Sequence, residues 1–203
     1  MFKKLASEAL GLSDIGIIVP PSEYNKVDAD DYLFNEDGEK IFFLIKSKKD
    51  EYCFTNLGLI HVDGDSAVSS KRTIRRYEFA SHAVSEVVLE TAGTIDMDVE
   101  LKFVLDQDTR FSIDVRKNFI EQLKDVYKAL ITIGKIQKRD ELARANALEC
   151  LQAAAAVYKL NSVAADDSVA QQFNTLLAHY NAATLDRFTR RDFSAVFERY
   201  IHN

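Results

Sequence analysis

Two neighbouring segments with a strict two-residue alternation constrain the fold more than any other feature of the sequence. In Ile95–Leu105 every odd position is apolar, and the even positions up to residue 102 are charged. In Thr109–Val115 the apolar residues at positions 111, 113 and 115 alternate with polar ones. Because successive side chains of a β-strand point to opposite faces, each segment is predicted to be a strand with one buried face. The polar residues Asp106, Gln107 and Asp108 between them predict a turn, and hence an antiparallel hairpin.

The register of this hairpin is predicted from its charges. Both apolar sets must stay on one face, and residues of opposite charge are favoured as cross-strand neighbours. These two conditions place Lys102 opposite Asp114 and Glu100 opposite Arg116. A pairing of Lys102 with Arg110 would contradict this register.

Five further segments have the short lengths and β-favouring residues of strands. Asp63 and Gly64 predict a hairpin-type turn after the third of them. No helical segment separates the strands, so they are predicted to pair antiparallel and to close into a small barrel of about seven strands. The five segments are Ile41–Lys46, Glu51–Phe54, Leu57–Val62, Lys71–Phe79 and Ser85–Thr91.

A helix is predicted directly after the second alternating segment. It begins at Asn118, which can cap it together with Glu121 in a capping box. Its apolar residues recur at helical spacing as far as Ile133. Strands followed by a helix that covers the open end of the sheet give an α+β fold.

The last third of the chain is predicted to be helical, because it lacks the residues that make tight turns. The chain has 7 Gly and 2 Pro, and none of them follows Gly134. Apolar side chains recur at helical spacing in three stretches; the second has cap candidates at Asp166–Ser168, and the third begins with a capping-box-like Thr189–Asp192. The three apolar stripes are Leu142, Ala145, Leu148, Leu151, Ala155 and Tyr158; Val169, Phe173, Leu176, Leu177 and Tyr180; and Phe193, Val196, Phe197, Tyr200 and Ile201.

These patterns divide the chain into three expected segments. Residues 1–30 contain a short amphipathic helix, Met1–Leu12, and a lead-in; residues 31–136 form the barrel with its capping helix; residues 137–203 form an all-α extension. A helical extension of this size has only a marginal core of its own. Its apolar stripes are therefore expected to pack either on the barrel or against another subunit, and the sequence leaves both alternatives open.

Composition and charge exclude several classes of function. Lys and Arg number 26 against 32 Asp and Glu, for a net charge of −6. Because the protein is acidic and has no basic tail, nucleic acid is not an expected partner. No apolar run approaches the ~20 residues of a membrane-spanning helix, and Met1–Leu12 lacks the apolar core of a secretory signal. We therefore expect a cytoplasmic protein whose two cysteines, Cys53 and Cys150, are reduced and buried.

No arrangement of residues typical of catalysis or metal binding occurs in the sequence. The histidines at positions 61, 82, 179 and 202 are scattered, and none has zinc-ligand spacing. Motifs of a nucleophile elbow, a P-loop or a dinucleotide-binding loop are absent. Asp96, Asp98 and Glu100 share a strand face, but alternate positions lie ~7 Å apart, too far to converge easily on one cation. We expect no cofactor, no metal and no enzymatic activity, and interpret these carboxylates as a solvated face or a charged subunit interface.

Several segments together resemble one protein family. They read KSKKDEYCFTNLGLIHVDG, KRTIRRY, ETAGTIDMDVELKF, FSIDV and LKDVYKAL, in chain order. The chain is similar to the bacterial pleckstrin-homology (PH) domains, and within them to the YvbH-like subgroup, which adds a C-terminal helical oligomerisation region. The resemblance implies a PH-like seven-stranded antiparallel barrel capped by a helix, ring-like homo-oligomers built through barrel strands, and a binding role without catalysis.

Two clusters of cations are the candidate binding residues. Eukaryotic PH domains often hold phosphoinositides through a lysine in the first hairpin and an arginine on the next strand, and guanidinium groups suit phosphate. That spacing is not reproduced here, and Asp50 and Glu51 dilute the first cluster. We interpret the cations mainly as solvated or interface charges, with an anion or lipid-headgroup site as the alternative. The clusters are Lys46, Lys48 and Lys49, and Lys71, Arg72, Arg75 and Arg76.

Three hypotheses of function follow. The first is a non-catalytic, self-assembling scaffold that binds a protein or peptide partner and no nucleic acid. The second is a module for anionic lipid headgroups, which would place the protein at a membrane surface. The third is peptide binding by strand addition, in the groove between a barrel strand edge and the helix that begins at Asn118.

Overall fold

The computed structural model describes residues 13–64, 71–91, 98–159, 166–186 and 188–201. The chain forms two compact units: the first comprises Met1–Gly134 and Arg191–Asn203, and the second Lys135–Arg190. The helix predicted at Met1–Leu12 lies outside the described residues. Among the residues that are described, no helix is both long and apolar enough to cross a membrane.

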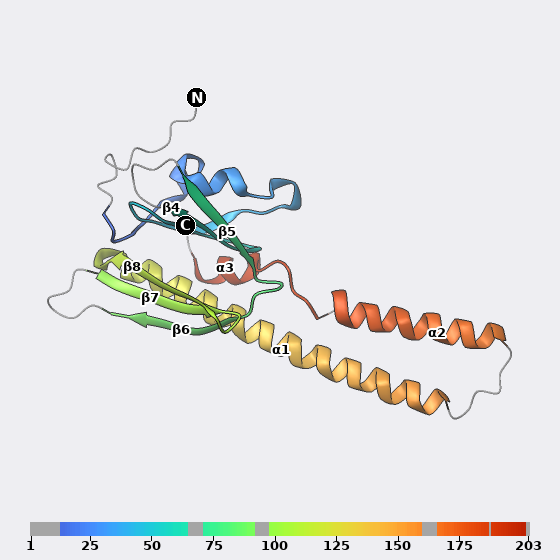
Figure 1. Cartoon of the computed structure of the whole chain (residues 1–203). Helices are drawn as coiled ribbons and strands as arrows, with labels where there is room; N and C mark the ends of the chain where they lie inside the picture. The colour runs from blue at the N-terminus through green and yellow to red at the C-terminus, as the bar shows by residue number, and fades with distance from the viewer. Residues whose placement is uncertain (1–12, 65–70, 92–97, 160–165, 187, 202–203) are drawn as a thin grey trace. The chain divides into compact units, whose positions relative to one another are not determined.

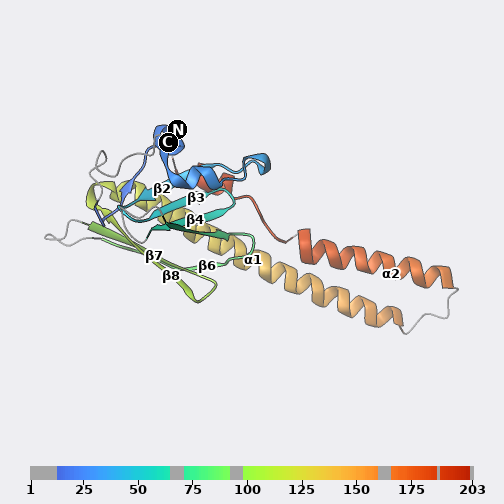
Figure 2. The same ribbon diagram turned by 45° about the horizontal axis from the view of Figure 1, so that its top comes forward.

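The first unit contains two antiparallel sheets (Figures 1 and 2). All seven predicted strands are present as β2–β8, with a two-residue strand added before them. The eight strands form two sheets of five and three strands in place of one seven-stranded sheet, and the expected α+β class, strands followed by helices, is confirmed. The five-stranded sheet is β1 (Ile17–Ile18), β2 (Ile41–Lys46), β3 (Glu51–Thr55), β4 (Gly58–Gly64) and β5 (Arg72–Glu78). The three-stranded sheet is β6 (Val84–Glu90), β7 (Asp98–Leu105) and β8 (Thr109–Arg116).

The short strand β1 joins the two sheets. It pairs with the edge of β2, where Ile17 lies opposite Lys46. Just before it, Gly16 forms a parallel bridge with Val115 of β8, and its N–H donates to the carbonyl of Asp114 over 2.7 Å. A Cβ at Gly16 would lie 2.8 Å from the side chain of Ile45, so this close approach requires glycine.

The register of the β7–β8 hairpin differs by two residues from the prediction. Glu100 lies opposite Asp114, and Lys102 lies opposite Ser112. The turn decides this register, because Leu105 already pairs with Thr109 and leaves only three residues in the loop. Two of those three, Asp106 and Gln107, have positive φ angles of 53° and 70°. The geometry of the turn thus overrides the preference for opposite charges across the strands.

The core of the first unit lies between the sheets and the first turns of α1 (Ile120–Lys159). The predicted apolar stripe of this helix is confirmed at four fully buried positions. A 3-10 turn, Lys117–Phe119, precedes the helix, so α1 begins two residues after the predicted cap Asn118. At Gly134 a Cβ would lie 2.4 Å from the carbonyl oxygen of Val84, which shows how closely α1 approaches β6. The buried stripe consists of Leu123, Val126, Leu130 and Ile133.

The outer face of the five-stranded sheet is covered by the chain that leads into it. This lead-in consists of three 3-10 turns, η1 (Pro21–Lys26), η2 (Asp28–Tyr32) and η3 (Asn35–Asp37). A second apolar cluster forms beneath it, and Cys53 is fully buried there as expected. Cys150 is exposed, which corrects the expectation that both cysteines are buried. The cluster contains Val19, Val27, Ala29, Leu44, Cys53, Ile60 and Val62.

The described part of the second unit contains two helices and little core. It comprises α1 from Lys135 onward, α2 (Asp166–Asn181) and a π-helical turn, η5 (Ala182–Asp186). The described part of α2 begins at Asp166, so the predicted cap candidates Asp166–Ser168 lie within its first turn. Among the described side chains of this unit, Ala183 is the one apolar group that is buried. Large apolar side chains are exposed instead: Leu142 (58%), Phe173 (62%), Leu177 (42%) and Tyr180 (48%).

The last helix, α3 (Ser194–Tyr200), belongs to the first unit. Its predicted apolar stripe is confirmed, since Phe193 and Phe197 are 1% and 0% exposed. The helix starts later than the predicted capping box, and Asp192 accepts a hydrogen bond from the Ser194 N–H over 2.7 Å. The sequence left open whether the C-terminal helices pack on the strand domain or on another subunit. In this structure α3 packs on the first unit.

Candidate functional site

The first cation cluster lies in the tight β2–β3 hairpin. The Ser47 hydroxyl accepts hydrogen bonds from the backbone N–H groups of Lys49 and Asp50, over 3.2 and 2.9 Å, and so shapes the loop. The backbone N–H of Lys48 donates to the Ser13 carbonyl over 2.9 Å. The side chain of Lys48 is exposed. That of Lys49 lies 3.9 Å from a carboxylate oxygen of the exposed Asp14.

Lys46 differs from its two neighbours, because it is paired with a buried carboxylate. Its ammonium group contacts Glu51, whose side chain is only 4% exposed. The same carboxylate accepts the backbone N–H groups of Asp28 and Ala29, over 3.2 and 2.9 Å, at the first turn of η2. Negative charge is stabilised at such a position. Lys46 and Glu51 therefore hold the lead-in on the sheet.

The arginines of β5 are distributed over both faces of the sheet. Arg72 and Arg76 point to the lead-in: Arg72 lies 3.5 Å from Asp28, and Arg76 lies 2.8 Å from Glu39 and 4.3 Å from the ring centroid of Phe34. The Glu39 side chain is fully buried. It also accepts hydrogen bonds from the Thr55 hydroxyl and the Phe34 N–H. Arg76 thus compensates a buried charge.

Arg75 points to the other face, as strand alternation requires. It donates to Asp63 over 2.8 Å, and this hydrogen bond lowers the pKa of the Asp63 carboxyl. Lys71 lies just before β5 and is exposed. The structure therefore separates the seven candidate cations: Lys46, Arg72 and Arg76 contact the lead-in or its carboxylate partners, whereas Lys48, Lys49, Lys71 and Arg75 lie at the surface.

The carboxylates on the outward face of β7 are engaged with their neighbours. Asp96 lies outside the described residues, and Asp98 lies opposite Arg116. Glu100 accepts hydrogen bonds from Ser112 and from Lys102, and these bonds lower its pKa. The pKa of Asp114 is raised, first by burial and then by the charge of Glu100. Within the described part of the chain, no three acidic, His or Cys side chains are grouped to hold a metal ion.

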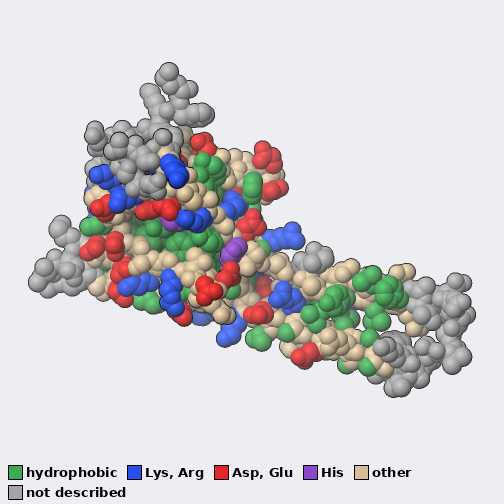
Figure 3. Space-filling view, in the orientation of Figure 1, with side chains coloured by type: hydrophobic (Ala, Val, Ile, Leu, Met, Phe, Trp, Pro, Cys, Tyr) green, Lys and Arg blue, Asp and Glu red, His purple; other side chains and the backbone are tan. Residues whose placement is uncertain are grey.

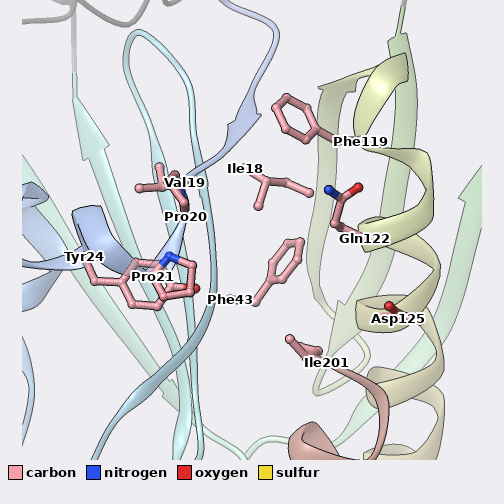
Figure 4. A pocket seen from close by; sticks show the side chains of 10 residues that line it. All are labelled: Ile18, Val19, Pro20, Pro21, Tyr24, Phe43, Phe119, Gln122, Asp125 and Ile201. Carbon is pink, nitrogen blue, oxygen red and sulfur yellow. The ribbon is translucent and has the colours of Figure 1, made fainter. Parts of the chain in front are cut away.

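A groove of about 450 Å³ lies between β1–β2 and the start of α1 (Figure 4). Ile18, Phe43, Phe119 and Ile201 contribute apolar side chains, and Gln122 contributes an amide. The hypothesis of peptide binding by strand addition concerns this place. The groove is present, but β1 of the same chain already pairs with the edge of β2. A peptide strand would have to displace β1.

A second site of the first unit, which the sequence did not reveal, holds α3. It is centred on Asn56 in the turn between β3 and β4, a residue that is 1% exposed. The Asn56 amide donates to Asp192 over 2.9 Å and to the Gly38 carbonyl over 3.3 Å. The backbone carbonyl of Asn56 accepts a hydrogen bond from the N–H of Phe193 over 2.9 Å. Asn56 thus holds the C-terminal segment in two ways: its side chain contacts the Asp192 side chain, and its backbone carbonyl contacts the Phe193 backbone.

Aromatic side chains complete this second site. Phe197 stacks on Phe42, with ring centroids 5.2 Å apart, and Phe193 meets Phe79 edge to face at 5.7 Å. Contacts of this kind contribute beyond the area they bury. The sequence gives only a weak signal for this site. Asn56 is typical of a turn, and its partner Asp192 lies 136 positions away in the chain.

The second unit has a smaller cavity, of about 270 Å³. Ala147, Cys150 and Leu151 of α1 line it on one side, and His179 and Ala183 on the other. Figure 3 shows green apolar side chains gathered along the helices of this unit. In its described residues the unit therefore presents apolar surface without the cluster of polar groups that a specific small-molecule site requires.

Comparison with known proteins agrees with this architecture. Residues 9–134 match the model of the bacterial PH domain, and residues 145–203 match that of the YvbH-like oligomerisation region. The protein YvbH of Bacillus subtilis (strain 168), described as uncharacterised, is 47% identical over 206 residues and covers all of both chains. A crystal structure of a PH-domain-containing protein from Exiguobacterium sibiricum 255-15 is 40% identical, with a TM-score of 0.77 over 93% of this chain and 100% of that one. The chain therefore belongs to the bacterial PH-domain family, as a YvbH-like protein with the C-terminal oligomerisation region.

Proposed function

We propose that this protein is a non-catalytic scaffold that self-associates through its helical unit and presents its PH unit to a protein partner. The observation that carries the proposal is the uncovered apolar surface of the helical unit. Phe173 and Leu177 lie one helical turn apart on α2, and they are 62% and 42% exposed. A helix whose apolar stripe faces solvent is stable only when another surface covers it.

The match to an oligomerisation region supports a second copy of this chain as that surface, since the match includes all of α2. The described part of the unit buries only Ala183 among its apolar side chains, so it lacks a core of its own. Helices of this kind commonly gain their core by association between subunits.

The arrangement of the assembly is proposed to be a closed ring. Cyclic symmetry is common in homo-oligomers and uses the same contact repeatedly. In the described residues β5 and β6 end their respective sheets, because each pairs with a single neighbouring strand. Such edges are templates for pairing with another chain. This observation supports a lateral contact between PH units, in addition to the contact between helical units.

The test replaces apolar side chains of α2 that do not contribute to any core. The variant Phe173→Asp with Leu177→Asp is compared with the control Asn174→Asp with Ala178→Asp, which adds the same charges at exposed positions of the same helix with the same spacing. We expect the first variant to lose oligomeric mass in size-exclusion chromatography with light scattering and the control to keep it. Retention of the full mass by both variants would contradict the proposal.

Binding of anionic headgroups remains the alternative proposal. Lys48 and Lys71 are exposed and support it, whereas the engagement of Lys46 and Arg76 with buried carboxylates counts against it. Flotation with phosphatidylserine vesicles at low salt distinguishes the two functions, because surface attraction of this kind is strongest there. No flotation at low salt would end the alternative.

A further inference from the structure

The C-terminal segment, Arg191–Ile201, points to a more specific form of self-association. We propose that in the assembled protein this segment docks on the PH unit of a neighbouring copy, so that subunits exchange α3. The inference rests on the proposed self-association and adds the contact that connects the subunits. The docking site consists of Lys40, Phe42, Asn56, Phe79 and Thr132, and is called the α3 site below.

The α3 site is complete within one PH unit. Lys40 lies 3.0 Å from Glu198, and the Thr132 hydroxyl lies 3.1 Å from that of Tyr200. Together with the hydrogen bonds of Asn56 and the two phenylalanine pairs, these contacts join every turn of α3 to the first unit. Nothing in the site depends on whether the segment comes from the same chain or from another.

The segment has the properties of a bound peptide. Its helix has only seven residues, which is too short to be stable in water, so it folds when it docks. Recognition combines a polar contact with two apolar anchors. Asp192 is held by hydrogen bonds from Ser194 and from Asn56, which lower its pKa although burial acts in the opposite direction. Phe193 and Phe197 are almost entirely buried.

The order of the chain places the helical unit between the PH unit and its own α3. The chain leaves the first unit after Gly134 and returns to it at Arg191. The matched oligomerisation region spans residues 145–203, so it includes most of the helical unit and all of α3. If the whole region serves assembly, α3 contributes by contacting another copy.

Energetics permit this exchange without loss of contacts. A segment that docks on a neighbouring copy makes the same hydrogen bonds and the same aromatic contacts as one that docks on the PH unit of its own chain. The choice depends on the connection and on the effective concentration of segments around each site. Residues 189 and 190, just before the docked segment, form neither helix nor strand, and so provide a connection that can change direction. Association of the helical units raises the effective concentration of neighbouring segments.

Disulfide trapping distinguishes the two modes of docking. Both chains carry Cys150→Ser, because Cys150 is exposed, whereas the other cysteine, Cys53, is fully buried. One chain carries Asn56→Cys, and a chain of different length, extended by a tag, carries Asp192→Cys. They are produced together at equal amounts and oxidised. A second pair, Lys40→Cys with Glu198→Cys, tests a solvent-exposed contact of the same site.

Exchange predicts a covalent species that contains one chain of each length on a non-reducing denaturing gel. Random mixing limits it to about half of the chains, because each site draws on segments from both kinds of chain. Absence of this species for both pairs overturns the inference. Before oxidation, the molar mass of the same sample is measured by size-exclusion chromatography with light scattering. An oligomer that gives no mixed species refutes the exchange alone. A monomer refutes the proposed self-association as well.

Discussion

At the scale of single residues, buried carboxylates stand out in a unit that otherwise has an ordinary apolar core. Glu39 and Glu51 are 4% and 3% exposed, and each contacts a cation; Glu39 also accepts one backbone N–H of the lead-in and Glu51 accepts two. Burial of a charge is unfavourable unless it is paired and hydrogen-bonded. Here both conditions are met, and two of the cations that resembled an anion site, Lys46 and Arg76, turn out to be their counterions.

Replacement of Glu51 by Gln tests this role. The amide keeps the size of the side chain but leaves Lys46 without its charge partner and offers only one acceptor oxygen to the first turn of η2. We expect the free energy of unfolding to fall by about 2–4 kcal/mol, as for a buried ion pair that loses one partner.

Urea denaturation measures this change. The control is Glu36→Gln, since Glu36 is exposed in η3. The control is expected to change stability by no more than about 0.5 kcal/mol. Equal effects of the two substitutions would show that the Glu51 carboxylate does not hold the lead-in.

Acid is predicted to weaken the docking of α3 through Asp192. The pKa of this carboxyl is lowered in the folded protein, so the unfolded chain binds a proton first as the pH falls. The stability that the ionised group contributes is present above the unfolded pKa of about 3.9 and disappears as the pH drops through the folded pKa.

The substitution Asp192→Asn removes this titration. We expect the thermal midpoint of the wild-type protein to fall more steeply than that of the variant between about pH 5 and pH 3. The two proteins are compared by circular dichroism over this range. Parallel pH profiles would show that ionisation of Asp192 does not contribute to folding.

At the scale of secondary-structure elements, the β7–β8 hairpin shows how a turn and a charge pattern compete. The three-residue loop pairs Leu105 with Thr109, and this places two carboxylates, Glu100 and Asp114, opposite each other. Like charges in that position are destabilising. Lys102 moderates the repulsion, because it lies within 3.0 Å of Glu90 and 2.9 Å of Glu100.

The substitution Asp114→Asn is therefore predicted to stabilise the protein at neutral pH. The raised pKa of Asp114 means that its ionised form is disfavoured in the folded state, so removal of the charge relieves repulsion above the unfolded pKa of about 3.9. We expect a gain of a few tenths of a kcal/mol in urea denaturation at pH 7, and no gain at about pH 3. A loss of stability at pH 7 would contradict the observed register.

At the scale of the whole molecule, the chain is organised as a PH unit that is interrupted by a helical unit. The boundary at Gly134–Lys135 falls inside the continuous helix α1, and the chain re-enters the first unit at Arg191. A truncation in the middle of α1 therefore removes more than the helical unit. It also removes α3, and with it the partners of Phe42 and Phe79.

A chain that ends after Lys138 is predicted to be less stable than the full-length protein. Loss of Phe193 and Phe197 uncovers apolar surface on the PH unit, and changes of this size cost about 3–5 kcal/mol for each large side chain. We expect a lower midpoint in thermal unfolding, and partial recovery when a synthetic peptide of residues 190–203 is added in excess. A truncated chain as stable as the full-length protein would show that the docking of α3 contributes little.

Much of the fold could be predicted from the sequence, because its signals are local. Alternation in residues 95–115 identified two strands and their buried face, and apolar spacing identified the helical segments. The two helices predicted over residues 118–133 and 142–158 are one continuous helix, α1. The resemblance carried by the strand and helix motifs indicated the family. The function of the cations was harder, because Lys46 and Arg76 look the same in the sequence whether they face solvent or a buried carboxylate.

The sequence by itself thus determined which segments are strands and helices, which of their faces are apolar, and to which family they belong. Only the tertiary structure decided the register of β7–β8, the partners of the basic residues, and the return of α3 to the PH unit at Asn56. The physical reason is the range of the interactions. Periodicity is set by neighbours along the chain, whereas a contact such as Asn56 with Asp192 joins positions that only the folded chain brings together.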